Sequence, residues 1–167
     1  FHLTALRVGG EEYPCERTRY HDPVAMGKDK AKDVKMKQVP GVTFAGTFDP
    51  HRDASFLYQS TGLYTLDADA LDDVEAAYKR IIKDPSVVLC FRSITGSGLK
   101  VVVFGPRVST AEEYTTVYNR IFALKGREWG IEDRLDVATK DCSRLCFLSY
   151  DPDAHVNWKA VPLVLDQ

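Results

Sequence analysis

Two aspartates, Asp67 and Asp69, stand two residues apart at the end of a mostly apolar stretch that begins at Gly62. The stretch 62–69 predicts a β-strand, in which side chains at i and i+2 share a face with their Cα atoms about 6.5–7 Å apart. Two carboxylates held in this way repel one another unless a cation lies between them. We therefore expect the pair to hold Mg²⁺ or Mn²⁺, whose oxygen ligands are commonly shared with substrate phosphates. An Asp-x-Asp pair also occurs in ordinary loops and helix caps, and the motif alone leaves that alternative open.

A glycine-rich turn, Thr95-Gly96-Ser97-Gly98, supplies hydroxyl groups and is followed by Lys100, with Ser93 just before it. Its glycines let backbone N–H groups approach an anion. The turn is not a P-loop, because it lacks the GxxxxGK[ST] pattern and precedes a strand rather than a helix. As an isolated motif it equally describes the tip of a β-hairpin.

A third acid, Asp136, lies between Leu135 and Val137, and two cations, Lys140 and Arg144, follow it. Surface carboxylates are common in loops, so Asp136 by itself indicates little. Three acids with several cations and a glycine turn suggest phosphoryl or nucleotidyl transfer. In that chemistry two metal ions about 3.5–4 Å apart activate the attacking oxygen and stabilise the leaving pyrophosphate. Lysine and arginine then hold the triphosphate as its charge moves.

The elements that must position these residues follow from hydrophobic spacing, helix caps and turns. A buried stripe from Val74 to Ile82 and a capping box at Thr110-Ala111-Glu112-Glu113 predict two helices. Gly46, within a strand expected over 41–48, marks a close approach by another backbone or a ligand. The predicted elements after residue 60 are strand 62–69, helix 72–83, strands 86–92 and 99–104, helix 110–129, and strands 134–137 and 144–149.

This order of strands and helices predicts an α+β fold, with an RRM-like (split βαβ) antiparallel sheet that carries both helices on one face. The other face is left open for a ligand. We expect a single domain over 1–167, with an N-terminal α/β subdomain in 1–59 and the RRM-like core in 60–157. The chain begins with Phe1 rather than Met, which indicates a fragment of a longer protein.

Composition limits the function classes further. A net charge of −2 over 167 residues argues against a protein that grips polyanions with its whole surface. Any nucleic-acid contact is therefore local. No apolar run approaches the ~20 residues of a membrane span and no secretory signal opens the chain, so we expect a cytoplasmic protein without a membrane partner. The candidates for nucleic-acid binding are Lys35, Lys37, Arg92 and Arg107.

Four cysteines do not indicate a disulfide framework, and a reducing compartment fits them best. Cys142 and Cys146 could be imagined as zinc ligands with His155. Their spacing is poor for such a site.

The order and spacing of these motifs resemble the primase-polymerases of the archaeo-eukaryotic primase superfamily. Within it, the chain is most similar to primase-like amino-terminal domains that precede helicases in bacterial mobile elements and phages, related to virulence-protein-E-type domains. The first motif of that family, hydrophobic-Asp-x-Asp, matches residues 66–69, and its third, hydrophobic-Asp followed by basic residues, matches Leu135-Asp136. Its second motif has a histidine where this chain has Lys100. The resemblance covers residues from about 35 to 157.

The resemblance implies that Asp67, Asp69 and Asp136 coordinate two divalent ions, Mg²⁺ or Mn²⁺. It further implies (d)NTPs as substrates, a single-stranded DNA template and primer, a fused or associated helicase, and a bacterial, phage or mobile-element origin. Lysine in place of histidine retains phosphate binding as a permanent point charge, but not proton transfer near neutral pH. The residues expected to bind the nucleotide are Ser97, Lys100, Lys140 and Arg144.

Two other functions remain open. A non-catalytic nucleic-acid-binding or replication-initiator module would keep the fold without the chemistry, and its binding would be indifferent to metal. A glycosyltransferase could use Asp-x-Asp to hold a nucleotide sugar, but it would normally need a larger α/β domain.

Overall fold

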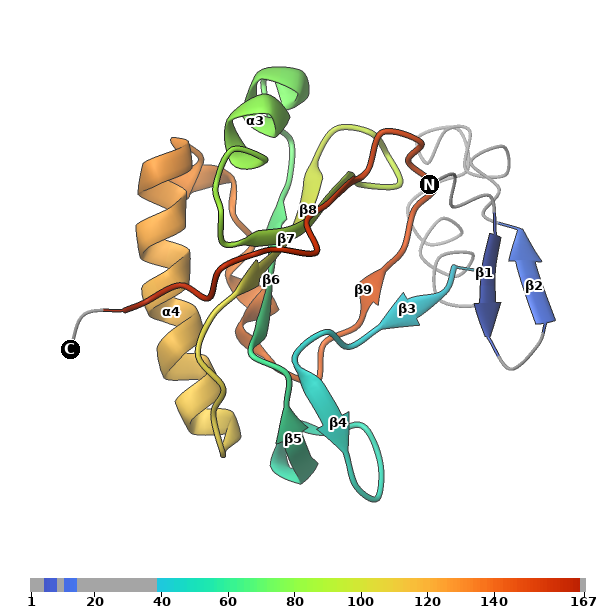
Figure 1. The fold of residues 1–167 in the computed structure, drawn as a ribbon, viewed down its shortest axis with the longest axis vertical. Coiled ribbons are helices and arrows are strands. Elements are labelled where there is room, and N and C mark those ends of the chain that lie inside the picture. The colour runs from blue at the N-terminus through green and yellow to red at the C-terminus, as the bar shows by residue number, and fades with distance from the viewer. Residues whose placement is uncertain (1–4, 9–10, 15–38, 166–167) are drawn as a thin grey trace.

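The computed structural model describes residues 5–8, 11–14 and 39–165 (Figure 1). Its N-terminal hairpin pairs β1 (Ala5–Val8) with β2 (Glu11–Pro14). The lysine-rich run over 28–37, with Lys35 and Lys37, lies outside the described residues.

The centre of the fold is an antiparallel sheet of four strands, β6 (Leu63–Ala68), β7 (Val87–Arg92), β8 (Leu99–Phe104) and β10 (His155–Val156). Their order in the sheet is β10-β7-β8-β6 (Figure 1). The helices are α3 (Val74–Ile81) and α4 (Ala111–Trp129). No helix in the described part of the chain is long and apolar enough to cross a membrane.

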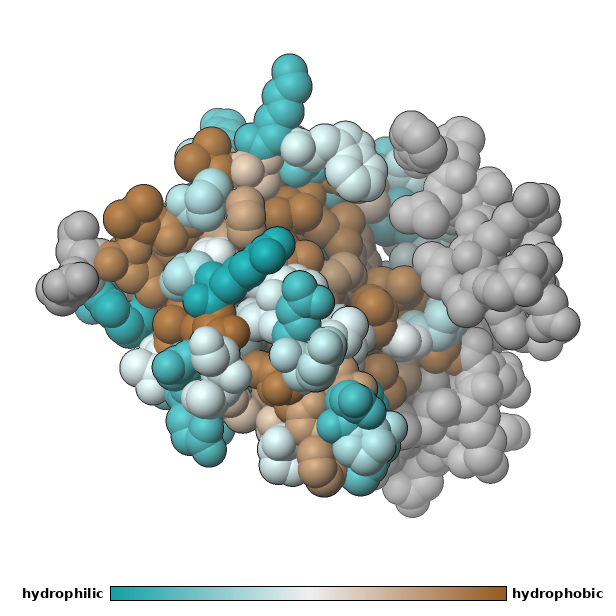
Figure 2. All heavy atoms as spheres, turned by 60° about the horizontal axis from the view of Figure 1, so that its bottom comes forward, coloured by the Kyte–Doolittle hydropathy of each residue, from teal (hydrophilic) through white to brown (hydrophobic). Residues whose placement is uncertain are grey.

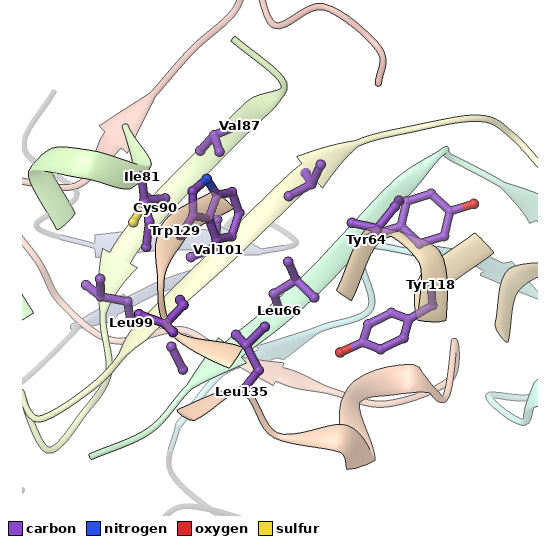
Figure 3. Packing of buried hydrophobic residues seen from close by; sticks show 14 of the residues in the cluster. Tyr64, Leu66, Ile81, Val87, Cys90, Leu99, Val101, Tyr118, Trp129 and Leu135 are labelled. Carbon is purple, nitrogen blue, oxygen red and sulfur yellow. The ribbon is translucent and has the colours of Figure 1, made fainter. Parts of the chain in front are cut away.

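Both helices contribute to one buried cluster with alternate residues of β6 and β8 (Figure 3). Tyr64 and Leu66 of β6 and Val101 of β8 point into this cluster, where they meet Ile81 of α3 and Trp129 of α4. Alternation along a strand places the intervening side chains on the opposite face of the sheet. Because the two helices pack with an antiparallel sheet, the predicted α+β class is confirmed. Alternation along β6 and β8 places Asp67 and Lys100 on the face away from the helices.

Local capping explains why both helices begin where the sequence predicts. The Asp73 carboxylate accepts a hydrogen bond from the Ala76 N–H at 2.9 Å, and the Thr110 hydroxyl accepts one from the Glu113 N–H at 3.1 Å. Each cap satisfies an N–H group that has no partner inside the helix.

The predicted strand over 41–48 is wrong, because it is two strands, β3 (Gly41–Val42) and β4 (Gly46–Phe48). Between them, the carbonyl of Ala45 accepts from the Thr61 N–H at 2.9 Å, so this stretch bonds to a loop rather than to a ladder. β4 pairs with β5 (Leu57–Ser60), which follows the 3₁₀ helix η2 (Ala54–Phe56). The close approach expected at Gly46 is confirmed, since a Cβ there would lie 2.3 Å from the Gln59 carbonyl oxygen.

The last two predicted strands are also wrong in extent. The segment around 134–137 makes only one bridge, Leu135 with Ala68, between the 3₁₀ helices η3 (Glu132–Arg134) and η4 (Val137–Lys140). Of 144–149, only β9 (Cys146–Phe147) is a strand, and it pairs with β3 outside the central sheet. Asp136 and Asp141 accept hydrogen bonds from the N–H groups two residues on, which folds both stretches into turns.

Candidate metal centre

Three carboxylates meet at the end of β6. Asp67 lies in the strand, Asp69 just after it, and Asp136 precedes η4; one possible ligand atom from each lies within 4.8 Å of the others. The chain around Leu135 runs beside this strand end and holds the third acid there. The Asp136 N–H donates to the Asp67 carbonyl at 2.8 Å, and the Asp69 N–H donates to the Arg134 carbonyl at 2.9 Å.

Asp67 is the most buried of the three, at 9% exposure. Its Oδ2 atom forms an ion pair with Lys100, which lies directly opposite on β8. Its Oδ1 atom is buried and has no hydrogen-bond partner among the described residues. An unpaired buried carboxylate oxygen is costly, and a divalent ion in the carboxylate cluster would satisfy it. The donor set, three carboxylates open to added water or phosphate oxygens, fits Mg²⁺ or Mn²⁺.

Asp136 is held by its own loop and by Arg144. Its Oδ1 accepts from the Ala138 N–H at 2.9 Å, and its Oδ2 lies 3.2 Å from the Arg144 Nη2. Asp69 is exposed to solvent. The centre therefore has one buried, one half-buried and one exposed carboxylate, and two of them contact a cation of the protein.

A cavity of about 350 Å³ adjoins this centre, lined both by residues of the sheet face away from the helices and by Tyr114 of α4. Asp67, Lys100 and Arg144 line it together with apolar side chains that include Phe44 and Leu145. Arg52 also lines the cavity and donates a hydrogen bond to the Ser143 carbonyl. Sequence reasoning missed Arg52, because 49–53 carries only the signal of a turn.

The glycine hairpin packs against the strand end that carries the acids. A Cβ at Gly98 would lie 2.3 Å from the Ala68 carbonyl oxygen, so only glycine allows this approach. The Leu71 N–H donates to the Ser97 carbonyl at 2.9 Å, while the Ser97 hydroxyl lies 2.9 Å from that of Thr95. The hairpin thus positions the acids through its backbone.

Gly98→Ala is expected to destabilise the protein by about 1–3 kcal/mol, because the Ala68 backbone must move away from the added methyl group. Chemical denaturation measures the loss. Gly41→Ala is the control, since a Cβ there meets the Leu145 side chain at an ordinary 3.4 Å. Equal stability of the two variants would contradict the close approach.

Three other residues predicted from the sequence to bind nucleotide or nucleic acid do not line the cavity. Ser97 and Lys140 are exposed and do not line it in the described structure. Arg107 is exposed beyond Phe104, at the opposite end of the β6–β8 pair from Lys100. Four residues of strand separate these ends, a distance of about 13 Å.

Arg92 lies on the helix-covered face, where alternation along β7 and β8 places it. Its guanidinium contacts the buried carboxylate of Asp151 at 3.1 Å and Glu75 at 2.7 Å, and it lies 5.0 Å from the ring centre of Tyr78. These contacts join α3 and the loop before β10 to the sheet. The charge of Arg92 is therefore used in packing.

The zinc alternative finds no support. A search of the described residues for three or more potential metal ligands close together finds the acid trio. That group does not include Cys142, Cys146 or His155. Burial raises the pKa of the Cys142 thiol to about 11, which keeps it protonated near neutral pH.

Seen from the side of β4 and β5, the surface alternates between hydrophilic and apolar residues (Figure 2). No single polar face dominates this view. Contact with a polyanion is thus expected to be local, at sites such as the cavity beside the carboxylates.

Comparison with known proteins gives a family. The family described as BT4734-like, N-terminal domain, matches residues 34–155, which include all three acids and both paired cations. No curated protein and no solved structure gives a significant match. Because the match extends over more than half of its length, the chain belongs to the BT4734-like N-terminal domain family.

Proposed function

We propose that this domain is a metal-dependent nucleotidyltransferase that makes primers or extends DNA on a single-stranded template. The observation that carries the proposal is the convergence of Asp67, Asp69 and Asp136, with a buried oxygen on Asp67 that has no hydrogen-bond partner among the described residues. The trio lies beside a cavity that is lined in part by cationic side chains. The resemblance to primase-polymerases, whose motifs in this chain include the same three acids, also supports it.

Each residue has a distinct part in this proposal. Asp67, Asp69 and Asp136 would hold two divalent ions, Mg²⁺ or Mn²⁺, which when bound activate the attacking 3′-hydroxyl and stabilise the leaving pyrophosphate. Lys100 and Arg144 contact the acids and line the cavity, so they are within reach of a triphosphate bound to the same centre. Such preplaced cations stabilise charge that develops on the phosphates.

The proposed substrates are (d)NTPs with a single-stranded DNA template and primer, and the proposed partner is a fused or associated helicase. The proposed setting is the cytoplasm, with a bacterial, phage or mobile-element origin. The substrates, the helicase and the origin come from the resemblance alone, whereas the cytoplasmic setting comes from the composition and the cysteines.

The test is incorporation of labelled nucleotide by the purified protein on single-stranded DNA, with and without a primer, using dNTPs or NTPs and either Mn²⁺ or Mg²⁺. Metal-dependent product supports the proposal. If no product forms with any combination of metal, template and nucleotide, the proposal is wrong.

A non-catalytic nucleic-acid-binding module is the second candidate, and one observation favours it. The Lys100–Asp67 and Arg144–Asp136 pairs give two of the three acids a cation without any metal. Fluorescence anisotropy with labelled single-stranded DNA and with nucleotide separates the two functions. Tighter nucleotide binding with Mn²⁺ indicates the enzyme, and DNA binding that is unaffected by Mn²⁺, without nucleotide binding, indicates the module.

A further inference from the structure

The acid trio carries its own counter-ions. Lys100 lies against Asp67 in a pair whose side chains are only 11% and 12% exposed, and Arg144 contacts Asp136. Arg52 adds a third cation to the wall of the same cavity, and Asp141 adds a further carboxylate. Within the trio, Lys100 and Arg144 offset two of the three negative charges, which allows like-charged carboxylates to converge.

A divalent ion would disturb this balance. Asp67 offers the buried, unpartnered Oδ1 to such an ion, while its Oδ2 remains against the Lys100 ammonium. Metal and ammonium would then share one carboxylate, and the two positive groups repel one another across a short distance. The same competition arises at Asp136 with Arg144. An ion in the centre therefore weakens the hold of the acids on both cations.

We propose that Lys100 and Arg144 are counter-ions that a divalent metal displaces, and that with Arg52 they then form a polyphosphate-binding site in the adjoining cavity. Its volume of about 350 Å³ lies within the range for small-ligand sites. The phosphate groups replace the carboxylates as partners of the displaced cations. This inference rests on the metal centre of the proposed function but does not require nucleotidyl transfer.

Its thermodynamic signature is positive coupling between metal and polyphosphate. The metal releases the cations that the phosphates need, and the phosphates hold those cations away from the metal ligands. Linkage makes the effect reciprocal, and couplings of this kind typically change affinity by about 5- to 150-fold. A metal that bonds directly to phosphate oxygens also gives such coupling. The Mn²⁺ affinity of a variant without the competing ammonium therefore has to be measured as well.

The first measurement is the affinity of the protein for Mn²⁺ in the absence of polyphosphate. Electron paramagnetic resonance of the unbound Mn²⁺ monitors the titration. Lys100→Met is expected to bind Mn²⁺ more tightly than the wild type, because the competing ammonium is gone. Lys79→Met is the control, since it removes an exposed lysine paired with Glu75 on α3. Unchanged or weaker Mn²⁺ binding by a folded Lys100→Met protein overturns the inference. Should that variant not fold, Arg144→Gln tests the same competition at Asp136.

The second measurement is the affinity for inorganic tripolyphosphate by calorimetry. Preformed Mn²⁺–tripolyphosphate is titrated into Mn²⁺-loaded protein, and metal-free tripolyphosphate into metal-free protein, so that chelation in solution is the same for every variant. We expect binding about 5- to 150-fold tighter with metal. Equal affinities overturn the inference.

Arg52→Gln is expected to weaken tripolyphosphate binding while leaving Mn²⁺ affinity without anion unchanged. Arg127→Gln is the matched control, because that arginine is 82% exposed on α4. Equal effects of the two substitutions overturn the assignment of Arg52. Coupling without nucleotide incorporation rejects nucleotidyl transfer alone, whereas incorporation without coupling rejects this inference alone.

Discussion

Asp67→Asn is expected to lower nucleotide incorporation by at least about 100-fold. Loss of a residue that merely supports a metal ligand costs 10- to 100-fold, and Asp67 is proposed as a ligand itself. Asparagine keeps the shape of the side chain but removes the charge from the most buried member of the trio. It also leaves Lys100 without the carboxylate that faces it across β6 and β8. Primer extension with Mn²⁺ or Mg²⁺ measures the effect.

The control for this prediction is Asp153→Asn, on the loop before β10, where the carboxylate is 74% exposed. It loses the same charge without touching the acid trio and is expected to retain activity. Mn²⁺ binding by each variant shows whether activity is lost through the metal. Folded Asp67→Asn protein with full activity would remove Asp67 from the centre and with it the proposed mechanism.

Lys125→Met is expected to reduce the free energy of unfolding by about 3–5 kcal/mol, the usual cost of removing one partner of a buried ion pair. The Lys125 ammonium lies 2.8 Å from Asp84 Oδ2, and the two side chains are 5% and 10% exposed. Methionine retains the apolar stem but leaves the Asp84 carboxylate buried without its cation. The Trp129 indole N–H, 3.1 Å from the same oxygen, gives only partial compensation.

Urea denaturation measures this loss, and Lys79→Met is the control. Lys79 pairs with Glu75 on the surface of α3, where both side chains are more than half exposed, so its loss is expected to cost under about 1 kcal/mol. Equal losses in the two variants would show that the Asp84–Lys125 pair is not a buried contact in solution.

The effect of Lys125→Met also depends on pH. Burial opposes ionisation of Asp84, but hydrogen bonds from Lys125 and Ser86 outweigh it and hold the pKa of the carboxyl below its ordinary value of 3.8. A lowered pKa in the folded state contributes stability above that ordinary value, and the contribution disappears as pH falls below it. The stability difference between wild type and variant is therefore expected to be largest near neutral pH and to shrink below about pH 3.8. A difference that grows in acid would contradict this assignment.

Features encoded by neighbouring residues could be predicted well. The strand that ends at Asp67, the helix after Asp73 and the helix after Thr110 all follow from hydrophobic spacing and a capping side chain. The hairpin around Gly98 follows in the same way from its glycines. Each of these signals acts over a few residues, so the rest of the chain does not need to be known.

Features that depend on distant partners could not be predicted. β10 is two residues long and exists because it meets the edge of β7, and β9 pairs with β3, which lies far earlier in the sequence. A strand of two residues is too short to show the alternation of apolar and polar residues by which a strand is predicted. The ion pairs of Arg92 show the same limit, since its partners Glu75 and Asp151 lie far from it in the sequence.

The sequence by itself determined the kinds of groups available: a pair of acids on one strand face, a third acid before two cations, and a lysine after a glycine turn. Only the tertiary structure decided which of them meet. Asp136 joins Asp67 because one backbone bridge lays Leu135 beside Ala68, across a separation of 67 residues that no local pattern reports. Arg52 joins the cavity, and Arg107 stays outside it, for the same reason: proximity in space is set by strand pairing and packing, not by residue type.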